Sequence, residues 1–207
     1  MTIRVHRIPY STNVERVALA AGIKGIDVEW VDHDPADRSA LVALSGQPLT
    51  PVAEVDGEVV VDSMRIVERL EELAPEPALY PADPAERAAT DIFVEWFNEV
   101  WKGPPNAIDD ERAKPAPDTD RIESLLARAR SLTPRFEALL ADRPFLLSSA
   151  PGVADVCAFP FLKYALIDTD PGDTEPFHPI LEECLRPVEP YPRLADWVRR
   201  VDALARA

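Results

Sequence analysis

The sequence has few of the residues on which several classes of protein depend. It contains only two cysteines, Cys157 and Cys184, among 207 residues. This number rules out a disulfide framework, and no metal-ligand spacing surrounds either cysteine, so we expect no metal. Lys and Arg number 22 against 37 Asp and Glu, and the net charge is −15 with no basic stripe. Nucleic-acid binding needs a basic surface that releases counterions, so we expect no nucleic-acid partner.

Long apolar runs are absent as well, and none could span a bilayer. An acidic membrane surface would repel this chain, so we expect no membrane partner. The segment that begins at Thr2 alternates like a strand and lacks the apolar core of a signal peptide, which predicts a cytoplasmic location. The acidity also disfavours long-range attraction of anionic substrates. An anion must therefore be held by local groups, such as the backbone amides at the start of a helix.

The first part of the chain predicts a small α/β domain over residues 1–75. Apolar and charged residues alternate in the first strand, and apolar residues then recur at helical spacing up to Gly22. Asp56-Gly57-Glu58 separates two short apolar runs, which is a hairpin signal. The predicted order is β-α-β-α-β-β-α, with strands at 2–8, 28–31, 52–55 and 59–61 and helices at 11–22, 37–44 and 62–73.

The rest of the chain predicts an all-helical domain over residues 84–207, joined to the first by a proline-rich linker. Pro134 predicts a kink or restart in one helix, and Pro160 a bend in another. Residues 103–120 hold four prolines and several charges, which predicts an exposed loop. Helices are expected at 85–102, 121–140, 153–167, 181–185 and 192–205. The fold class is therefore α/β plus all-α.

Three local patterns occur together in the first domain. Pro9-Tyr10-Ser11 precedes Arg16-Val17 and Leu19, Leu49-Thr50-Pro51-Val52 leads into the hairpin, and Asp62-Ser63 precedes Ile66 and Leu70. In their order and spacing they resemble the N-terminal domain of glutathione S-transferases. Gly152-Val153-Ala154-Asp155 and Tyr191-Pro192-Arg193-Leu194 are similar to the helical domain of the same family. The resemblance covers nearly the whole chain and implies a thioredoxin-like domain followed by a helical bundle.

The resemblance makes Ser11 the catalytic residue, because the family's Ser, Cys or Tyr at this place activates the thiol of glutathione. A helix N-terminus has free N–H groups and a positive dipole end, which favour a thiolate, and a hydroxyl can donate one more bond to the sulfur. The alternative is that Ser11 is only a helix cap. Tyr10 offers a second candidate hydroxyl, but we expect its ring to line the domain cleft instead.

The other two patterns imply the binding site for the thiol cosubstrate. By resemblance Pro51 follows a cis peptide bond, so that Thr50 presents its backbone N–H and C=O to an extended peptide. Asp62 and Ser63 match the acidic-Ser pair that holds the γ-glutamyl group of glutathione at a helix start. A trans proline and a plain N-cap are the alternatives. No base precedes Pro51 where the family often has one, so another low-molecular-weight thiol could replace glutathione.

Aromatic residues of the helical domain are candidates for the electrophile pocket. Trp96, Trp101 and Tyr164 are the expected substrate-binding residues, with Phe97, Lys102 and Phe161 near them. The alternative is that such residues, at helical spacing, are core. Cys157 lies in the most apolar segment and is expected to be an inert core thiol.

Two functions follow from these patterns. The first is an S-transferase, with a role in detoxification, in which a Ser-stabilised thiolate attacks a small hydrophobic electrophile. Conjugation, isomerisation, ether cleavage and dehalogenation share that step, and the sequence does not choose among them. The second is a non-catalytic binding protein with the same fold. A thiol–disulfide oxidoreductase is disfavoured, because Ser11 stands where that chemistry needs a cysteine. By resemblance, the protein is expected to form a homodimer.

Overall fold

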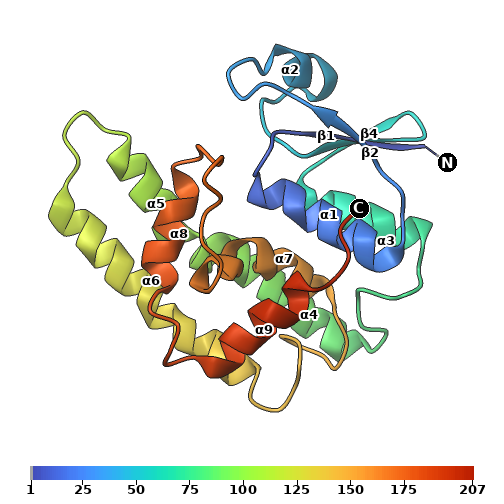
Figure 1. Ribbon diagram of the computed structural model, residues 1–207. Coiled ribbons are helices and arrows are strands. Elements are labelled where there is room, and N and C mark those ends of the chain that lie inside the picture. The colour runs from blue at the N-terminus through green and yellow to red at the C-terminus, as the bar shows by residue number, and fades with distance from the viewer. Residues whose placement is uncertain (1) are drawn as a thin grey trace. The chain divides into compact units, whose positions relative to one another are not determined.

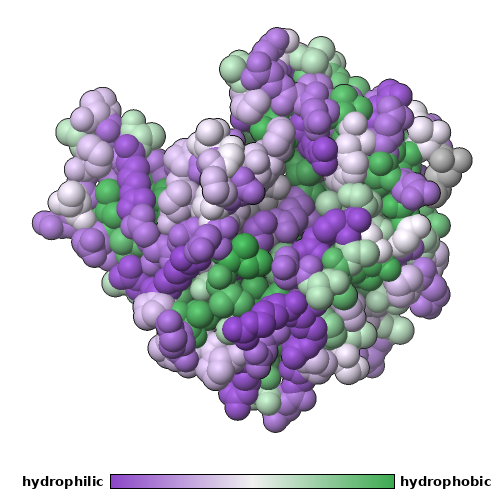
Figure 2. All heavy atoms as spheres, viewed as in Figure 1, coloured by the Kyte–Doolittle hydropathy of each residue, from purple (hydrophilic) through white to green (hydrophobic). Residues whose placement is uncertain are grey.

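The computed structural model describes residues 2–207, which divide into two compact units. The first runs to Leu79 and also contains Leu204–Ala207, and the second is Tyr80–Ala203. On the face shown in Figure 2, hydrophilic residues predominate and hydrophobic residues appear in small groups between them. None of the helices described is both long enough and apolar enough to cross a membrane.

The first unit is built on a four-stranded mixed sheet with the strand order β2-β1-β3-β4. β1 runs parallel to β2 and antiparallel to β3, and β3 and β4 form the predicted hairpin. Figure 1 shows α1 and α3 on one side of the sheet and α2 on the other. The elements are β1 (Ile3–Arg7), α1 (Thr12–Lys24), β2 (Glu29–Asp32), α2 (Ser39–Ser45), β3 (Val52–Val55), β4 (Glu58–Val61) and α3 (Ser63–Leu73). This order confirms the predicted thioredoxin-like fold.

α1 extends beyond Gly22, where the sequence pattern predicts its end. It continues to Lys24 and is closed by Gly25, whose φ of 62° is the left-handed conformation that glycine adopts at low cost. The Lys24 side chain is fully buried, pairs with Glu71, and donates from Nζ to the carbonyls of Ala74 and Pro77. These contacts join the end of α1 to α3 and to the segment after it.

Gly22 lies where the C-terminal residues pass close to the backbone of α1. The terminal residues lie along α1, where the Ala207 N–H donates to the Ala18 carbonyl and Trp30 Nε1 donates to the Ala207 carbonyl. A Cβ at Gly22 would lie 2.2 Å from the carbonyl oxygen of Ala205. A side chain at this position would therefore push the terminal segment away from α1.

The second unit is all-helical, as predicted. Its elements are α4 (Pro84–Trp96), the π-helical turn η1 (Phe97–Trp101), α5 (Gly103–Arg112), α6 (Thr119–Leu139), α7 (Val153–Leu162), the 3₁₀ turn η2 (Lys163–Ala165), α8 (Phe177–Leu185) and α9 (Pro192–Asp202). All ten residues of α7 are buried. Phe161 of α7 belongs to an aromatic cluster with Phe97, Trp101 and Phe136, in which neighbouring ring centroids lie 4.6 to 6.4 Å apart.

Three predicted features of this unit are corrected. Residues 103–112 form α5 and not a loop, because Pro104 and Pro105 stand in its first turn, where a missing N–H costs nothing. Pro134 lies inside α6, which continues through it, so the helix does not restart there. The helix predicted to reach residue 167 ends at Leu162 and continues as η2.

Candidate functional site

Ser11 is the N-cap of α1, which is the place predicted for the catalytic hydroxyl. Its Oγ accepts a 3.4 Å hydrogen bond from the Val14 N–H, and its side chain is half-buried. An oxygen that accepts from an N–H keeps its own proton for another acceptor. Ser11 is therefore a helix cap, and its hydroxyl can still donate a hydrogen bond to a sulfur.

Tyr10, immediately before Ser11, has an unusual backbone conformation. Its φ is 63°, a region that a residue with a side chain rarely occupies, and such strain typically costs about 1–3 kcal/mol. The residue is 48% exposed. The residue therefore lies partly at the surface of this unit.

Pro51 precedes β3, and the Thr50–Pro51 peptide bond is cis, as the resemblance implies. The strand that follows is anchored by Val52, which packs with Ile8 and Leu41 in a buried cluster. The end of β1 and the start of β3 are thus fixed next to each other by the core below them.

Asp62 and Ser63 open α3. The Asp62 carboxylate accepts from the N–H groups of Met64 and Arg65 at 2.9 and 3.2 Å, and its φ of 74° is again in the strained region. Ser63 is 3% exposed. Asp62 therefore acts as the N-cap, and Ser63 lies inside the first turn of the helix.

A buried arginine lies beneath this helix start, and sequence reasoning assigned it no role. Arg16 is 2% exposed, and its Nη1 donates to Ser63 Oγ and to Asn13 Oδ1, both at 3.2 Å. A guanidinium cannot accept a hydrogen bond, so Ser63 Oγ is the acceptor and its own proton remains free to donate. A buried positive charge also makes this helix start more favourable for an anion. The sequence offers two signals for it, namely a charged residue within an apolar helical pattern and its place in the pattern that begins at Pro9.

The stretch just before Pro51 contains no basic residue, but Arg38 from the start of α2 reaches this stretch. Its Nη1 donates to the Pro48 carbonyl at 3.0 Å and its Nε to the Pro35 carbonyl at 3.2 Å. Within residues 2–207 it forms no ion pair. A cation therefore lies beside the loop that leads to Thr50.

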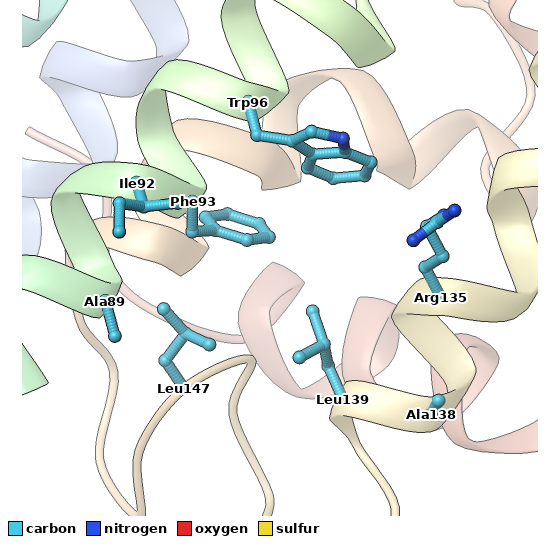
Figure 3. Close-up of a pocket in the computed structure, with 8 residues that line it drawn as sticks. All are labelled: Ala89, Ile92, Phe93, Trp96, Arg135, Ala138, Leu139 and Leu147. Atoms are coloured by element: carbon cyan, nitrogen blue, oxygen red, sulfur yellow. The ribbon is translucent and has the colours of Figure 1, made fainter.

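The three aromatic candidates of the helical unit separate into two groups. Trp96 lines a cavity of about 530 Å³ between α4, the end of α6 and Leu147 (Figure 3). Trp101 and Tyr164 are 1% and 4% exposed and do not line that cavity. Trp101 stacks on Phe97 and Tyr164 on His178. Trp101 and Tyr164 are therefore core residues, which was the alternative to a role in the pocket.

Both cysteines are buried, Cys157 completely and Cys184 to 1% exposure. Burial raises the pKa of the Cys184 thiol to about 12, which keeps it protonated. Residues 2–207 contain no group of three His, Cys, Asp or Glu side chains that could hold a metal ion. Neither thiol is exposed, as disulfide exchange requires.

Comparisons with known proteins match both parts of the chain. Residues 5–78 match the family described as glutathione S-transferase, N-terminal domain, and residues 119–200 match glutathione S-transferase, C-terminal domain. The chain is 27% identical over 165 residues to glutathione transferase omega-1 of Caenorhabditis elegans, covering 78% of this chain and 63% of the relative. It is 38% identical over 85 residues to maleylacetoacetate isomerase of Pseudomonas aeruginosa, covering 38% of this chain and 40% of the relative. The matches thus span less than two thirds of these curated relatives.

A solved structure has the same fold over nearly the whole chain. A glutathione S-transferase from Methylobacillus flagellatus with GSH bound is similar with a TM-score of 0.79 and 23% identity, covering 96% of this chain and 94% of that one. Both domain families match in the order that the two units have along the chain. This chain belongs to the glutathione S-transferase superfamily.

Proposed function

We propose that this protein is a glutathione S-transferase-like enzyme that acts on a small hydrophobic electrophile. The observation that carries the proposal is the pair of helix starts in the first unit, where Ser11 opens α1 and Ser63 opens α3. Both hydroxyl oxygens accept from an N–H of the protein, so both protons are free for a ligand. One helix start suits a thiolate and the other a carboxylate.

In the proposed mechanism the cosubstrate is glutathione or another low-molecular-weight thiol. Its peptide backbone pairs with Thr50 before Pro51, and its γ-glutamyl carboxylate accepts from the Ser63 hydroxyl above Arg16. Asp62 receives the ammonium group, and Arg38 pairs with the opposite carboxylate. Tyr10 contributes its exposed ring to substrate binding.

Ser11 stabilises the sulfur after the thiol has lost its proton to solvent. The thiolate electron pair then forms a carbon–sulfur bond with the electrophile, and either a leaving group departs with its bonding electrons or a double bond shifts and takes up a proton. Reversal of an addition after bond rotation gives isomerisation. The similarity to maleylacetoacetate isomerase supports that reaction as one of the candidates.

The first test is calorimetric titration with glutathione and with mycothiol, followed by turnover with an aryl halide and an α,β-unsaturated ketone. Ser11→Ala should still bind the thiol but lose at least tenfold in turnover, because the thiolate loses a hydrogen bond of about 1.5–3 kcal/mol. Ser39→Ala is the control, since it removes a hydroxyl from the exposed start of α2. Full turnover in the Ser11 variant would overturn the catalytic role.

Ser63→Ala tests the cosubstrate site separately. Loss of a charge-assisted hydrogen bond should weaken thiol binding roughly tenfold or more with little change in kcat. If the protein binds mycothiol but not glutathione, the proposed mechanism stands and mycothiol is the cosubstrate.

A non-catalytic binding protein is the second candidate, favoured by the absence of a base before Pro51 and by the engagement of Ser11 as a cap. It predicts ligand binding without turnover of any electrophile. We further propose a homodimer in the cytoplasm, on the strength of the family resemblance. Light scattering at working concentration tests the dimer, and a monomer mass would exclude it.

A further inference from the structure

Two histidines that are far apart in the sequence lie next to each other on the sheet of the first unit. His6 Nδ1 lies 2.8 Å from His33 Nε2, which is a hydrogen-bond distance. His6 belongs to β1, and His33 directly follows β2, where its backbone N–H donates to the Arg7 carbonyl. Side chains alternate along a strand, so His6 lies on the sheet face opposite the buried Ile3 and Val5. The parallel pairing of β1 with β2 brings the two rings together, and no spacing in the sequence indicates it.

Glu54 of β3 determines which nitrogen of His6 carries a proton. Its Oε1 lies 3.0 Å from His6 Nε2, and a carboxylate only accepts hydrogen bonds, so Nε2 is the donor. In the neutral ring Nδ1 then holds a lone pair, which accepts from His33 Nε2–H. Glu54 is itself held by Arg4, whose Nη1 lies 3.6 Å from Oε1. The lone pair on His6 Nδ1 is therefore fixed in direction and aimed at His33.

The separation of these two nitrogens suits a shared metal ion. Two imidazole nitrogens on one ion, each bound at about 2.0–2.1 Å, lie about 2.8–3.4 Å apart when the angle at the metal is about 90–109°. The ring centroids are 5.1 Å apart, so the rings face each other end to end and one of them must turn toward the ion. His33 can turn, because among residues 2–207 its ring forms a hydrogen bond only with His6. The His6 side chain is 12% exposed and stays in place through Glu54.

We propose that His6 and His33 bind one divalent transition-metal ion, with water at its remaining positions. The ion would take the place of the proton that the two rings now share. His6 Nδ1 and His33 Nε2 become the ligands, and the proton of His33 moves to its Nδ1 by exchange with solvent. Imidazole suits Zn²⁺, Ni²⁺ and Cu²⁺, and Cu²⁺ is bound most tightly of these.

The surroundings of the pair favour such an ion in two ways. Glu54 would accept from the outer nitrogen of a metal-bound histidine, an arrangement that fixes the ring and makes it a more basic ligand. The net charge of −15, which repels anions, attracts cations at long range. Arg4 does not oppose this, because it is paired with both Glu29 and Glu54.

The proposed site differs from that of a resident cofactor. Catalytic zinc sites have three protein ligands and structural sites four, whereas this pair supplies two. The described part of the chain has no group of three such ligands, so we expect an exchangeable ion. The expectation of no metal rests on spacing along the sequence, and the fold changes it at this one place. None of the residues proposed to bind the thiol takes part.

Calorimetric titration of the untagged chain with CuCl₂, without any thiol, tests the proposal. We expect one Cu²⁺ per chain and no binding of Mg²⁺, which requires oxygen ligands. The paramagnetic resonance spectrum of bound Cu²⁺ should show coupling to two imidazole nitrogens. His178, the third histidine, is 2% exposed and bonded to Asp173, so it does not compete for the ion.

Three variants separate the parts of the site. Loss of the hydrogen-bond partner of a metal-bound histidine typically costs about 10–100-fold in metal affinity, so Glu54→Gln should weaken Cu²⁺ binding by that amount. His33→Gln removes a ligand and should weaken it at least as much. Glu29→Gln is the matched control, because Glu29 is a carboxylate that bonds to Arg4 and to neither histidine. Circular dichroism confirms that each variant is folded.

Three results would overturn the proposal. One is the absence of saturable Cu²⁺ binding, and another is equal Cu²⁺ affinity in the wild type and His33→Gln. The third is a resonance spectrum without nitrogen coupling, which would assign the ion to surface carboxylates. Equal effects of Glu54→Gln and Glu29→Gln would overturn the part assigned to Glu54. Because the titrations contain no thiol, failure of thiol binding elsewhere in this unit leaves the test unaffected.

Discussion

Replacement of Asp155 by alanine should be among the most destabilising single changes in the helical unit. Its carboxylate is 1% exposed and accepts three hydrogen bonds. The Leu146 N–H and Trp197 Nε1 donate to Oδ1 at 3.0 and 2.7 Å, and the Gly152 N–H donates to Oδ2 at 3.0 Å. This one side chain therefore holds the start of α7, the loop before it and α9.

The size of the stability loss follows from the three N–H donors that lose their acceptor in Asp155→Ala. Each buried donor that loses its acceptor costs about 1–3 kcal/mol. Two of the three bonds are buried, while the Gly152 N–H is partly exposed and can reach water. Removal of a buried carboxyl, whose pKa is raised by burial, returns part of this cost. We expect a net loss of roughly 3–5 kcal/mol, a large share of a typical stability of about 5–15 kcal/mol.

Urea unfolding followed by circular dichroism measures this loss. Asp155→Asn should cost less, about 1–3 kcal/mol, because its oxygen can still accept two bonds while its NH₂ group faces the third donor. Asp196→Ala is the control on α9, where an exposed pair with Arg199 contributes at most about 1 kcal/mol. The reasoning fails if the alanine and asparagine variants are equally stable, or if Asp155→Ala loses no more than Asp196→Ala.

Two further predictions concern a close contact and a pH dependence. Gly22→Ala should lower the free energy of unfolding by about 1–3 kcal/mol, because the new Cβ meets the Ala205 backbone. Gly103→Ala is the control, because its Cβ meets no atom within 4 Å and the change should be neutral or stabilising. Equal unfolding midpoints for the two variants would refute this. Glu111 accepts from Lys114 Nζ and the Asp118 N–H and forms an ion pair with Arg121, and the bond from Lys114 is the main reason that its pKa is lowered. The stability that Glu111 contributes is present above its unfolded pKa of about 4.3 and is lost as the pH falls through the lower folded value. The stability gap between wild type and Glu111→Gln should therefore close on acidification, and a gap independent of pH would contradict it.

The order of elements in the first unit could be predicted because each boundary has a local chemical cause. The hairpin at Asp56-Gly57, the cap at Asp62 and the alternation in β1 are all decided by neighbouring residues. The contrast is Gly22, which resembles a helix end in sequence. It lies inside α1, where its lack of a side chain leaves room for terminal residues more than 180 positions away, and no local pattern contains that information.

The missed helix α5 has a different cause. Proline in a helix interior breaks the hydrogen-bond ladder, but in the first turn it occupies positions whose N–H groups have no partner in any case. Pro104 and Pro105 stand in that first turn, and Ile108 and Glu111 then bury their side chains in the unit. Composition counts prolines without their positions, so it favoured a loop.

The candidate site was predictable to the extent that it is made of helix starts and a proline. Ser11, Pro51, Asp62 and Ser63 belong to patterns of adjacent residues, and the structure gives each the local conformation expected of it. Arg16 needed the fold, because its partner Ser63 is 47 residues away.

The proposed thiol site meets an electrostatic problem that the composition sets. A net charge of −15 disfavours anions at long range, so an anionic group must be held by local donors. At the start of α3 the buried Arg16 donates to Ser63 Oγ, so the serine hydroxyl, and not the guanidinium, makes the contact with the ligand. A hydroxyl fixed at a helix start accepts fewer ligand geometries than an exposed cation, and this arrangement suits selection of one polar cosubstrate.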